Sequence, residues 1–250
     1  MRNHQVIAIS GATSGMGNAV LNTVGNETSV VFSGRRQARI RQLEKEYNQM
    51  GHTVIGLCAD AKEVEHYGLL NALAEEKIGQ APTAFVLCAG RGLPGTLTTS
   101  DPKQWQELID INLLGAMHQL RTCAALFMEQ AKLMPKIRDI VVVGSTAGRS
   151  ISAANPVYGA TKFALHSIVE SLRQEVCTQN IRVTLIEPGF VRSEFQSVAG
   201  YDMDWFDNVE KEQGPFLEAQ DIADVIQYAL ELPPHVHIDD FRIRPTKQRV

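Results

Sequence analysis

Two side chains in the second half of the chain have the types and spacing needed for acid–base chemistry. Tyr158 and Lys162 stand four residues apart in PVYGATKFAL, a stretch with helical spacing. Residues four apart lie on one face of a helix, a turn apart, so the ammonium group can stand beside the phenol. A tyrosine ordinarily titrates near pH ~10, and a neighbouring cation favours its ionised form. Tyr158 is therefore a candidate to exchange a proton with a reacting oxygen, as acid in one direction and base in the other.

The elements that must hold this pair alternate along the chain. Short runs rich in Val and Ile are typical of buried parallel strands, and stretches with helical spacing separate them. The expected strands are Val6–Ile9, Val30–Phe32, Val54–Leu57, Ala84–Leu87, Ile140–Val143, Val183–Ile186 and Val236–Ile243. The expected helices include Ala38–Gln49, Glu63–Ile78, Trp105–Lys132, Phe163–Cys177 and Asp221–Leu230. This alternation predicts one α/β domain over residues 1–250, a doubly wound Rossmann-type fold with a seven-stranded parallel sheet and helices on both faces.

The segment SGATSGMG, from Ser10 to Gly17, joins the first expected strand to a helix. Gly11 allows a tight turn off the strand, Gly15 allows the backbone to approach a pyrophosphate, and Gly17 allows the helix to pack closely on the sheet. The helix N-terminus then presents free N–H groups to the phosphates. The Gly-x3-Gly-x-Gly spacing differs from the general dinucleotide pattern GxGxxG. The prediction of a phosphate-binding turn therefore rests on the position of this segment directly after the first strand.

Composition argues against several other classes of protein. Hydrophobic residues make up 44% of the chain and charged residues 21%, as in ordinary globular proteins. The 24 basic and 28 acidic residues are mixed along the chain, which indicates no nucleic-acid partner. No apolar run approaches the ~18 residues of a membrane span, so we expect no membrane association and a cytoplasmic location. The four cysteines lack ligand spacing, and His235 and His237 lack a third ligand, so no metal is expected.

The strongest signal is the stretch IVVVGSTAGRSISAANPVYGATKFAL, which resembles the catalytic strand and helix of the short-chain dehydrogenase/reductase family. The resemblance runs in order from Ser10 to about Ser193. It implies an oxidoreductase that moves a hydride between a nicotinamide cofactor and a small alcohol or carbonyl substrate. The catalytic residues that it implies are Asn112, Ser145, Tyr158 and Lys162. In this scheme Tyr158 is the acid/base, Ser145 holds the substrate oxygen, and Asn112 organises a proton-relay water.

The same resemblance implies the cofactor contacts. The glycine turn binds the pyrophosphate, the segment after the third strand contacts the adenine, and EPG after the sixth strand passes the nicotinamide. The implied contacts are Gly11, Thr13, Ser14, Gly15, Met16, Gly17, Asp60, Ala61, Cys88, Ala89, Gly90, Tyr158, Lys162, Pro188, Gly189, Val191 and Ser193. The family commonly has NNAG where this chain has LCAG at residues 87–90, and we expect altered packing there rather than loss of the cofactor.

The end of the second expected strand favours NADP(H) over NAD(H). An NAD enzyme normally ends this strand with an acidic residue that binds both ribose hydroxyls, whereas the 2′-phosphate of NADP needs a cation. The strand here ends in VFSGRR, without a carboxylate. Arg35 offers a planar guanidinium that matches the phosphate, with Arg36 beside it. Arg39 and Arg41 are interpreted as ordinary charges on a helix surface.

A narrower resemblance bears on the substrate. GSTAG, PVYGATK, IEPGFVRSEF, LPPHVHI and the closing RPT-Q pattern are similar to NADP-dependent 3-hydroxy acid and serine dehydrogenases. A substrate carboxylate would then need a cation, for which Arg91, Arg149 and Arg192 are candidates, although each is also plausible as a plain surface arginine. The aromatic segment 193–216 reads as irregular, and we interpret it as a substrate lid or as a surface excursion that packs its own aromatic residues.

Two alternatives stay open. The aromatic segment suggests a broad carbonyl reductase for apolar ketones, which would show no preference for carboxylated substrates. A catalytically silent NADP-binding regulator could keep the same fold, because a fold does not prove activity, but all the expected catalytic residues are retained. The long helices Trp105–Lys132 and Phe163–Cys177 resemble those through which family members associate, so a homo-oligomer, either a dimer or a tetramer, is expected.

Overall fold

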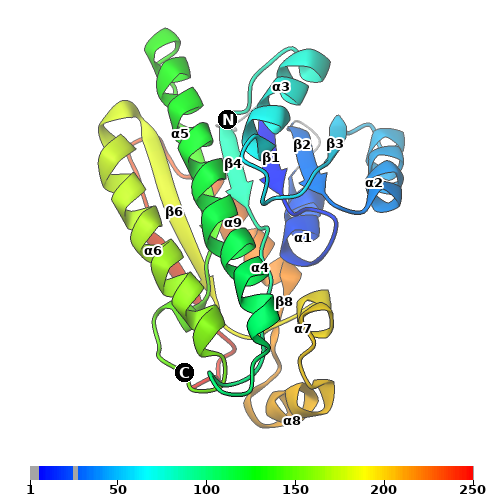
Figure 1. Ribbon diagram of the computed structural model, residues 1–250. Helices are drawn as coiled ribbons and strands as arrows, with labels where there is room; N and C mark the ends of the chain where they lie inside the picture. Colours follow the sequence, from blue (N-terminus) through cyan, green and yellow to red (C-terminus); the bar gives the residue numbers. More distant parts are fainter. Residues whose placement is uncertain (1–5, 25–27, 250) are drawn as a thin grey trace.

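The computed structural model describes residues 6–24 and 28–249 of the chain, and its centre is a seven-stranded sheet (Figure 1). The strands are β1 (Val6–Ser10), β2 (Ser29–Gly34), β3 (Val54–Cys58), β4 (Ala84–Leu87), β5 (Arg138–Val143), β6 (Ile181–Pro188) and β9 (Asp240–Ile243). Their order is β3-β2-β1-β4-β5-β6-β9, and every neighbouring pair is parallel. The strand order therefore changes direction between β1 and β4, where doubly wound folds bind their ligands. The predicted seven-stranded parallel sheet is confirmed.

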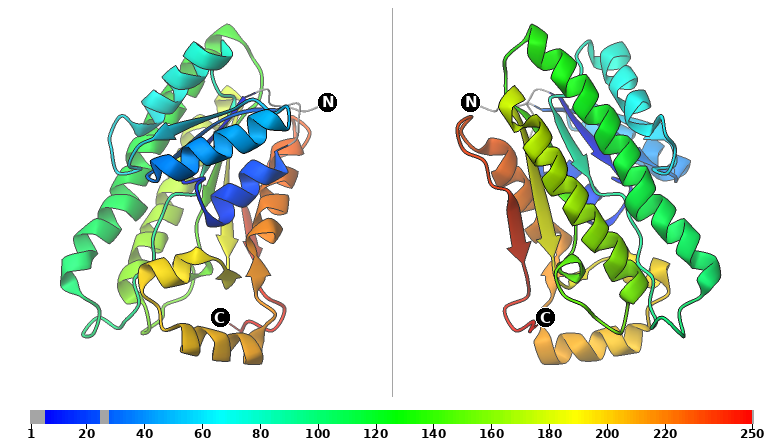
Figure 2. Two further views of the ribbon diagram at one scale, coloured as in Figure 1. Left: turned by 90° about the vertical axis from the view of Figure 1, so that its right-hand side faces the viewer. Right: turned by 60° about the vertical axis from the view of Figure 1, so that its left-hand side comes forward.

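Helices cover both faces of this sheet, as predicted. One face carries α3 (His66–Ile78), α5 (Ala116–Leu133) and α6 (Pro156–Val176), and the other carries α1 (Gly15–Thr23), α2 (Gln37–Gln49) and α9 (Ala219–Glu231). Figure 2 shows these two layers from opposite sides. Strands β1, β4 and β5 are buried at every residue because both of their faces are covered, which explains their unbroken apolar runs.

The long helix expected over Trp105–Lys132 is divided in the structure. A 3-10 turn, η1 (Pro102–Gln104), precedes α4 (Trp105–Ile109), and the π-helical segment η2 (Asp110–Gly115) separates α4 from α5. Such π-helical turns are rare and often mark functional sites. The expected helix over Phe163–Cys177 begins earlier, at Pro156, so that Tyr158 and Lys162 lie in its first two turns.

The segment 193–216, expected to be irregular, is largely helical. It contains α7 (Glu194–Ala199) and α8 (Met203–Gln213), which lie at the bottom of the molecule as drawn in Figure 1. Ser193 and Gln196 form a capping box at the start of α7, and the Asp202 carboxylate accepts hydrogen bonds from the first backbone N–H groups of α8. The short strands β7 (Val191–Arg192) and β8 (Leu217–Glu218) pair with each other across its base.

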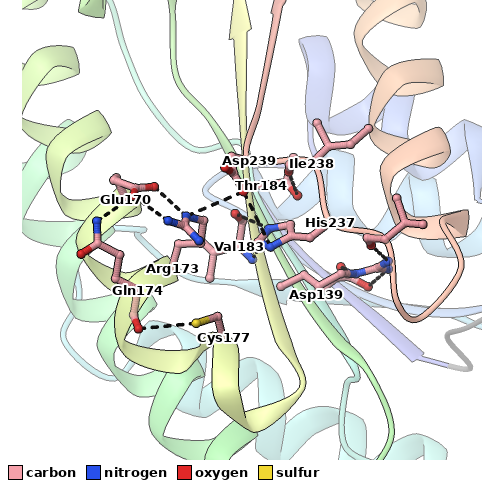
Figure 3. Close-up of polar contacts among 12 residues, drawn as sticks. Asp139, Glu170, Arg173, Gln174, Cys177, Val183, Thr184, His237, Ile238 and Asp239 are labelled. Atoms are coloured by element: carbon pink, nitrogen blue, oxygen red, sulfur yellow. Dashed lines mark hydrogen bonds and ion pairs between the residues drawn. The ribbon is translucent and has the colours of Figure 1, made fainter.

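The last strand is shorter than the predicted Val236–Ile243, because β9 begins only at Asp240. Beside the start of β6, the His237 side chain takes the place of a strand backbone. Its Nε2 lies 3.2 Å from the Val183 nitrogen and 3.0 Å from the Val183 oxygen (Figure 3). A side chain thus occupies the position of a ladder hydrogen bond, and regular pairing starts three residues later.

The described residues contain no helix that is both long and apolar enough to cross a membrane. They also contain no group of three or more acidic, histidine or cysteine side chains that could hold a metal ion. All four cysteines are free.

Candidate active site

The turn after β1 is shaped for close backbone approach. Gly11 has a φ of 78°, and a Cβ atom there would lie 2.8 Å from the Ala89 backbone of the neighbouring β4 turn. Gly15 has a φ of 52° and faces Ser193, whose Cβ is 3.8 Å from the position that a Gly15 Cβ would take. Helix α1 begins at Gly15, and the Ser14 side chain at its N-cap makes no capping hydrogen bond within the described chain. The first N–H groups of α1 are therefore available to an anion.

The two arginines after β2 lie in different surroundings. The Arg36 guanidinium donates to the Thr13 carbonyl at 2.8 Å and pairs with Glu194 of α7 at 3.2 Å. The Arg35 side chain is exposed and has no hydrogen-bond or ion-pair partner among the described residues. Arg35 is thus the cation of this pair that remains free for a phosphate, whereas Arg36 fastens the glycine turn to α7.

The residues expected to act on the substrate come together at the ends of β5 and α6. Tyr158 and Lys162 are buried, and the Tyr158 hydroxyl is hydrogen-bonded with the Ser145 side chain. Lys162 Nζ donates to the Val143 carbonyl at 3.1 Å and lies 5.8 Å from the centre of the Tyr158 ring. A phenol, a hydroxyl and an ammonium group therefore share one site.

Burial decides the charge state of this cluster. It raises the pKa of Tyr158 above its ordinary value, and the hydrogen bond with Ser145 offsets only part of that effect. Burial also lowers the pKa of Lys162 to about 8. The sequence led us to expect a tyrosine pKa lowered by the neighbouring cation, but burial shifts the pKa of Tyr158 in the opposite direction. At neutral pH Tyr158 therefore carries its proton and can act as an acid.

Asn112 lies on the π-helical segment η2 and is almost completely buried. Its Oδ1 accepts from the Arg91 N–H at 2.9 Å, and its Nδ2 donates to the Arg91 carbonyl at 2.9 Å and to Thr161 Oγ1 at 3.2 Å. The Asn112 amide thus fastens the loop after β4 to helix α6. Its expected role in a proton relay stays a prediction.

His166 is a residue that the sequence did not single out. It lies one turn after Lys162 on α6, and its Nε2 accepts a hydrogen bond from the Ser145 N–H at 3.4 Å. A Cβ at Gly144 or Gly148 would lie 2.4 Å from its ring, so two glycines make room for it under the Ser145 turn. Burial and the nearby Lys162 ammonium lower the pKa of His166 to about 4, which keeps the ring neutral. The signal available in the sequence was its i+4 spacing from Lys162.

The three arginines considered for a substrate carboxylate are all paired within the chain. Arg91 binds Glu107 and donates to Gln104 at 2.7 Å. Arg149 holds the completely buried Glu187 in a bidentate pair, with its shorter contact at 2.6 Å. Arg192 pairs with two carboxylates of α8, those of Asp207 at 2.7 Å and Glu210. None of the three lines the cavity described next.

A cavity of about 500 Å³ opens where β4, β5 and β6 end, beneath α7 and α8. The expected site residues that line it are Met16, Cys88, Gly90, Ser145, Tyr158, Lys162, Pro188, Gly189, Val191 and Ser193. Burial raises the pKa of Cys88 to about 12, so this thiol stays protonated. Arg35, Asp60 and Ala61 do not line the cavity. Asp60 pairs with Lys62 at 3.6 Å, and the Ala61 carbonyl accepts from Gln119 at 2.8 Å.

Comparison with known proteins places this site in a family. Residues 5–203 match the family model described as short chain dehydrogenase. The chain belongs to the short-chain dehydrogenase/reductase family. An uncharacterised oxidoreductase of Staphylococcus epidermidis, strain RP62A, is 29% identical over 242 residues, which cover 96% of this chain and 97% of that protein. This short-chain dehydrogenase/reductase is thus an oxidoreductase of the class that uses a nicotinamide cofactor on alcohol and carbonyl substrates.

Solved structures of serine dehydrogenases share the whole fold with this short-chain dehydrogenase/reductase. The closed form of a serine dehydrogenase complexed with NADP+ is 26% identical, with a TM-score of 0.85 and coverage of 98% of this chain and 96% of that one. The serine dehydrogenase of Escherichia coli is 25% identical, with a TM-score of 0.76 and coverage of 98% and 100%. The similarity extends past the matched family region and includes the segment that carries α7 and α8.

Proposed function

We propose that this chain transfers a hydride between NADP(H) and a small alcohol or carbonyl substrate, with Tyr158 as the acid/base. The single observation that carries the proposal is the hydrogen bond between Tyr158 and Ser145 beside a buried ammonium group, at the edge of a cavity that reaches the glycine turn. Two donors can then hold one substrate oxygen while charge develops on it.

In the reducing direction, a nicotinamide cofactor held at the glycine turn and beside Lys162 would supply the hydride that the carbonyl carbon accepts. Ser145 donates a hydrogen bond to the carbonyl oxygen, and Tyr158 transfers its phenolic proton to that oxygen as the C=O bond becomes a C–O single bond. The resulting phenolate lies near Lys162, whose ammonium stabilises it until a proton returns from solvent. Oxidation of an alcohol follows the same steps in reverse.

The residues at the other end of the site fit NADP(H). The free N–H groups at the start of α1 suit the pyrophosphate, and the Arg35 guanidinium, which pairs with no described residue, suits the 2′-phosphate. No carboxylate stands at the end of β2 to take ribose hydroxyls or to repel that phosphate. The complex of the similar serine dehydrogenase with NADP+ supports the same choice.

Isotope transfer tests the proposed function. The purified protein would be given NADPH deuterated on either face of C4 together with a panel of ketones and aldehydes, and the products analysed by mass spectrometry. We expect deuterium from one of the two faces only, bound to the carbinol carbon in a 1:1 ratio to NADPH oxidised. Absence of turnover across the panel, or deuterium lost to water, would refute hydride transfer.

A further inference from the structure

We infer that the substrate is an uncharged ketone or alcohol with an apolar substituent, such as an aryl group, and that the site discriminates against carboxylated substrates. The inference rests on the proposed function and names the substrate class of the same site. The competing class is a substrate with a carboxylate, such as the amino acid named for the structurally similar serine dehydrogenases.

The cavity lacks a cation that could pair with a carboxylate. Among the described residues that line it, Lys162 is the single cationic side chain, and its ammonium is committed to the Val143 carbonyl beside Tyr158. The nearby arginines Arg91, Arg149 and Arg192 are each neutralised by their own acidic partners. The aliphatic part of the Arg244 side chain packs against Gly189, and its Cγ lies 3.2 Å from the position that a Gly189 Cβ would take. Arg244 itself does not line the cavity.

A carboxylate already stands on the cavity wall. Asp202 lines the cavity and caps α8, where its Oδ1 accepts from the N–H groups of Asp204 at 2.9 Å and Trp205 at 3.1 Å. A second carboxylate in the substrate would face the negative charge of Asp202, and the one cationic side chain among the described residues that line the cavity, Lys162, already donates to the Val143 carbonyl. The charge on this wall therefore favours neutral substrates.

Aromatic side chains form a further part of the cavity wall. Phe195 packs edge-on against Tyr158, with ring centres 6.1 Å apart, and Trp205 also lines the cavity from α8. The Tyr201 hydroxyl is hydrogen-bonded with the Asn155 side chain and the Leu93 backbone, so its own polar group is satisfied and its ring is left to form the wall. Burial of an apolar substituent against these rings stabilises the complex, whereas burial of an unpaired charge opposes it.

A neutral methyl ester and the corresponding carboxylate, which share the same aryl ketone, test this inference. The reduction of methyl 4-acetylbenzoate and of 4-acetylbenzoate by NADPH would be compared as kcat/KM at pH 7, together with the oxidation of serine and 3-hydroxybutyrate by NADP+. We expect the neutral ester to exceed the acid by at least about tenfold, and the two carboxylated alcohols to be poorer still.

Asp202→Asn tests the origin of the preference. Asparagine also caps helices well, so α8 should persist while the charge is lost. We expect the ester-to-acid ratio to fall by at least about threefold in this variant. The matched control is Asp204→Asn, which removes a carboxylate from the same helical turn but outside the cavity lining and should leave the ratio unchanged.

The outcomes separate the inference from the function on which it rests. Equal or better turnover of the carboxylated substrates would overturn the substrate class and leave hydride transfer intact. A ratio unchanged in Asp202→Asn would overturn the role of Asp202. Absence of turnover of every compound, with NADPH still bound, would overturn both the inference and the proposed function.

Discussion

Two cavities lie along α6, and they differ in how the charged side chains that line them are paired. The cavity at the strand ends is lined by aromatic and small polar side chains and by Asp202, which forms no ion pair with the buried Lys162. The second cavity, of about 540 Å³, lies between α6 and β6, and two arginines and three carboxylates are among the residues that line it. Arg173 there pairs with Glu170 at 2.7 Å and lies 3.7 Å from Asp239 (Figure 3).

The contrast separates a cluster of ion pairs from the site that we propose to be reactive. In the second cavity the cations are offset by acidic neighbours, and Arg149 likewise binds Glu187 and Asp240. Such pairs hold neighbouring elements together, but because each charge is offset by its partner, they attract a charged ligand only weakly. In the first cavity the buried Lys162 ammonium forms no ion pair with any described residue and stands beside a phenol, an arrangement that costs stability and that is typical of catalytic sites. His166 lines the second cavity and reaches the Ser145 turn of the first.

Removal of the unpaired cation is expected to have the largest effect. Lys162→Ala deletes the ammonium that stabilises the tyrosine anion and that we expect to hold the nicotinamide ribose. We predict a fall in kcat/KM of at least about a thousandfold, at the upper part of the range for general acid–base catalysis, together with weaker NADPH binding. Turnover kinetics and NADPH fluorescence measure the two effects. Unchanged affinity for NADPH would show that Lys162 serves the proton transfer alone.

Arg35→Asp tests the free cation at the far end of the nucleotide site. The change removes the expected partner of the 2′-phosphate and adds an acceptor for ribose hydroxyls. We predict that kcat/KM falls by roughly a hundredfold with NADPH and does not fall with NADH, since a charged hydrogen-bonded pair contributes about 1.5–3 kcal/mol. Arg41→Asp, on the exposed surface of α2, is the matched control and should change neither value. Equal kcat/KM with NADPH and NADH in the unmodified protein would contradict the premise that Arg35 selects NADP(H).

His166→Leu tests the link between the two cavities. Leucine fills the space but cannot accept the Ser145 N–H, so the turn that carries the Ser145 hydroxyl should loosen. We predict a drop in kcat of about tenfold, the size expected for one hydrogen bond, with NADPH affinity unchanged. His166→Gln, which keeps an acceptor, should recover most of the loss. An equal loss in both variants would indicate packing alone.

The smallest effect is expected in the second cavity. Arg173→Ala removes a partly exposed guanidinium that pairs with Glu170 and lies near Asp239. Ion pairs of this kind contribute about 0–1 kcal/mol to the free energy of unfolding. We predict a change in melting temperature of a few degrees at most and kcat/KM within twofold of the parent. A loss of activity beyond tenfold would contradict the division between a structural and a reactive cavity.

Local patterns predicted much of the fold and the site. The strands, the glycine turn and the Tyr158–Lys162 pair are encoded in short spacings, so a single sequence reveals them. Helices α7 and α8 were missed because they are short and aromatic, although the Ser193–Gln196 capping box was readable.

Other features depend on contacts between distant residues. Arg149 and Glu187 are 38 positions apart, and no periodicity indicates that the folded chain pairs them. The direction of the Tyr158 pKa likewise follows from burial by Phe195 and its neighbours, which spacing on one helix does not reveal. The sequence therefore predicted which groups come together at the proposed site better than it predicted their surroundings.

Tyr158→Phe tests the central claim most directly, because it removes one hydroxyl and keeps the ring that packs against Phe195. The measurement is kcat on a ketone accepted by the parent, with NADPH binding followed separately by fluorescence. We predict that kcat falls by at least about a hundredfold while NADPH affinity stays within threefold of the parent, since the reaction loses its acid and the nucleotide keeps its contacts. Turnover within threefold of the parent would mean that the proton comes from another group and would contradict this account of the site.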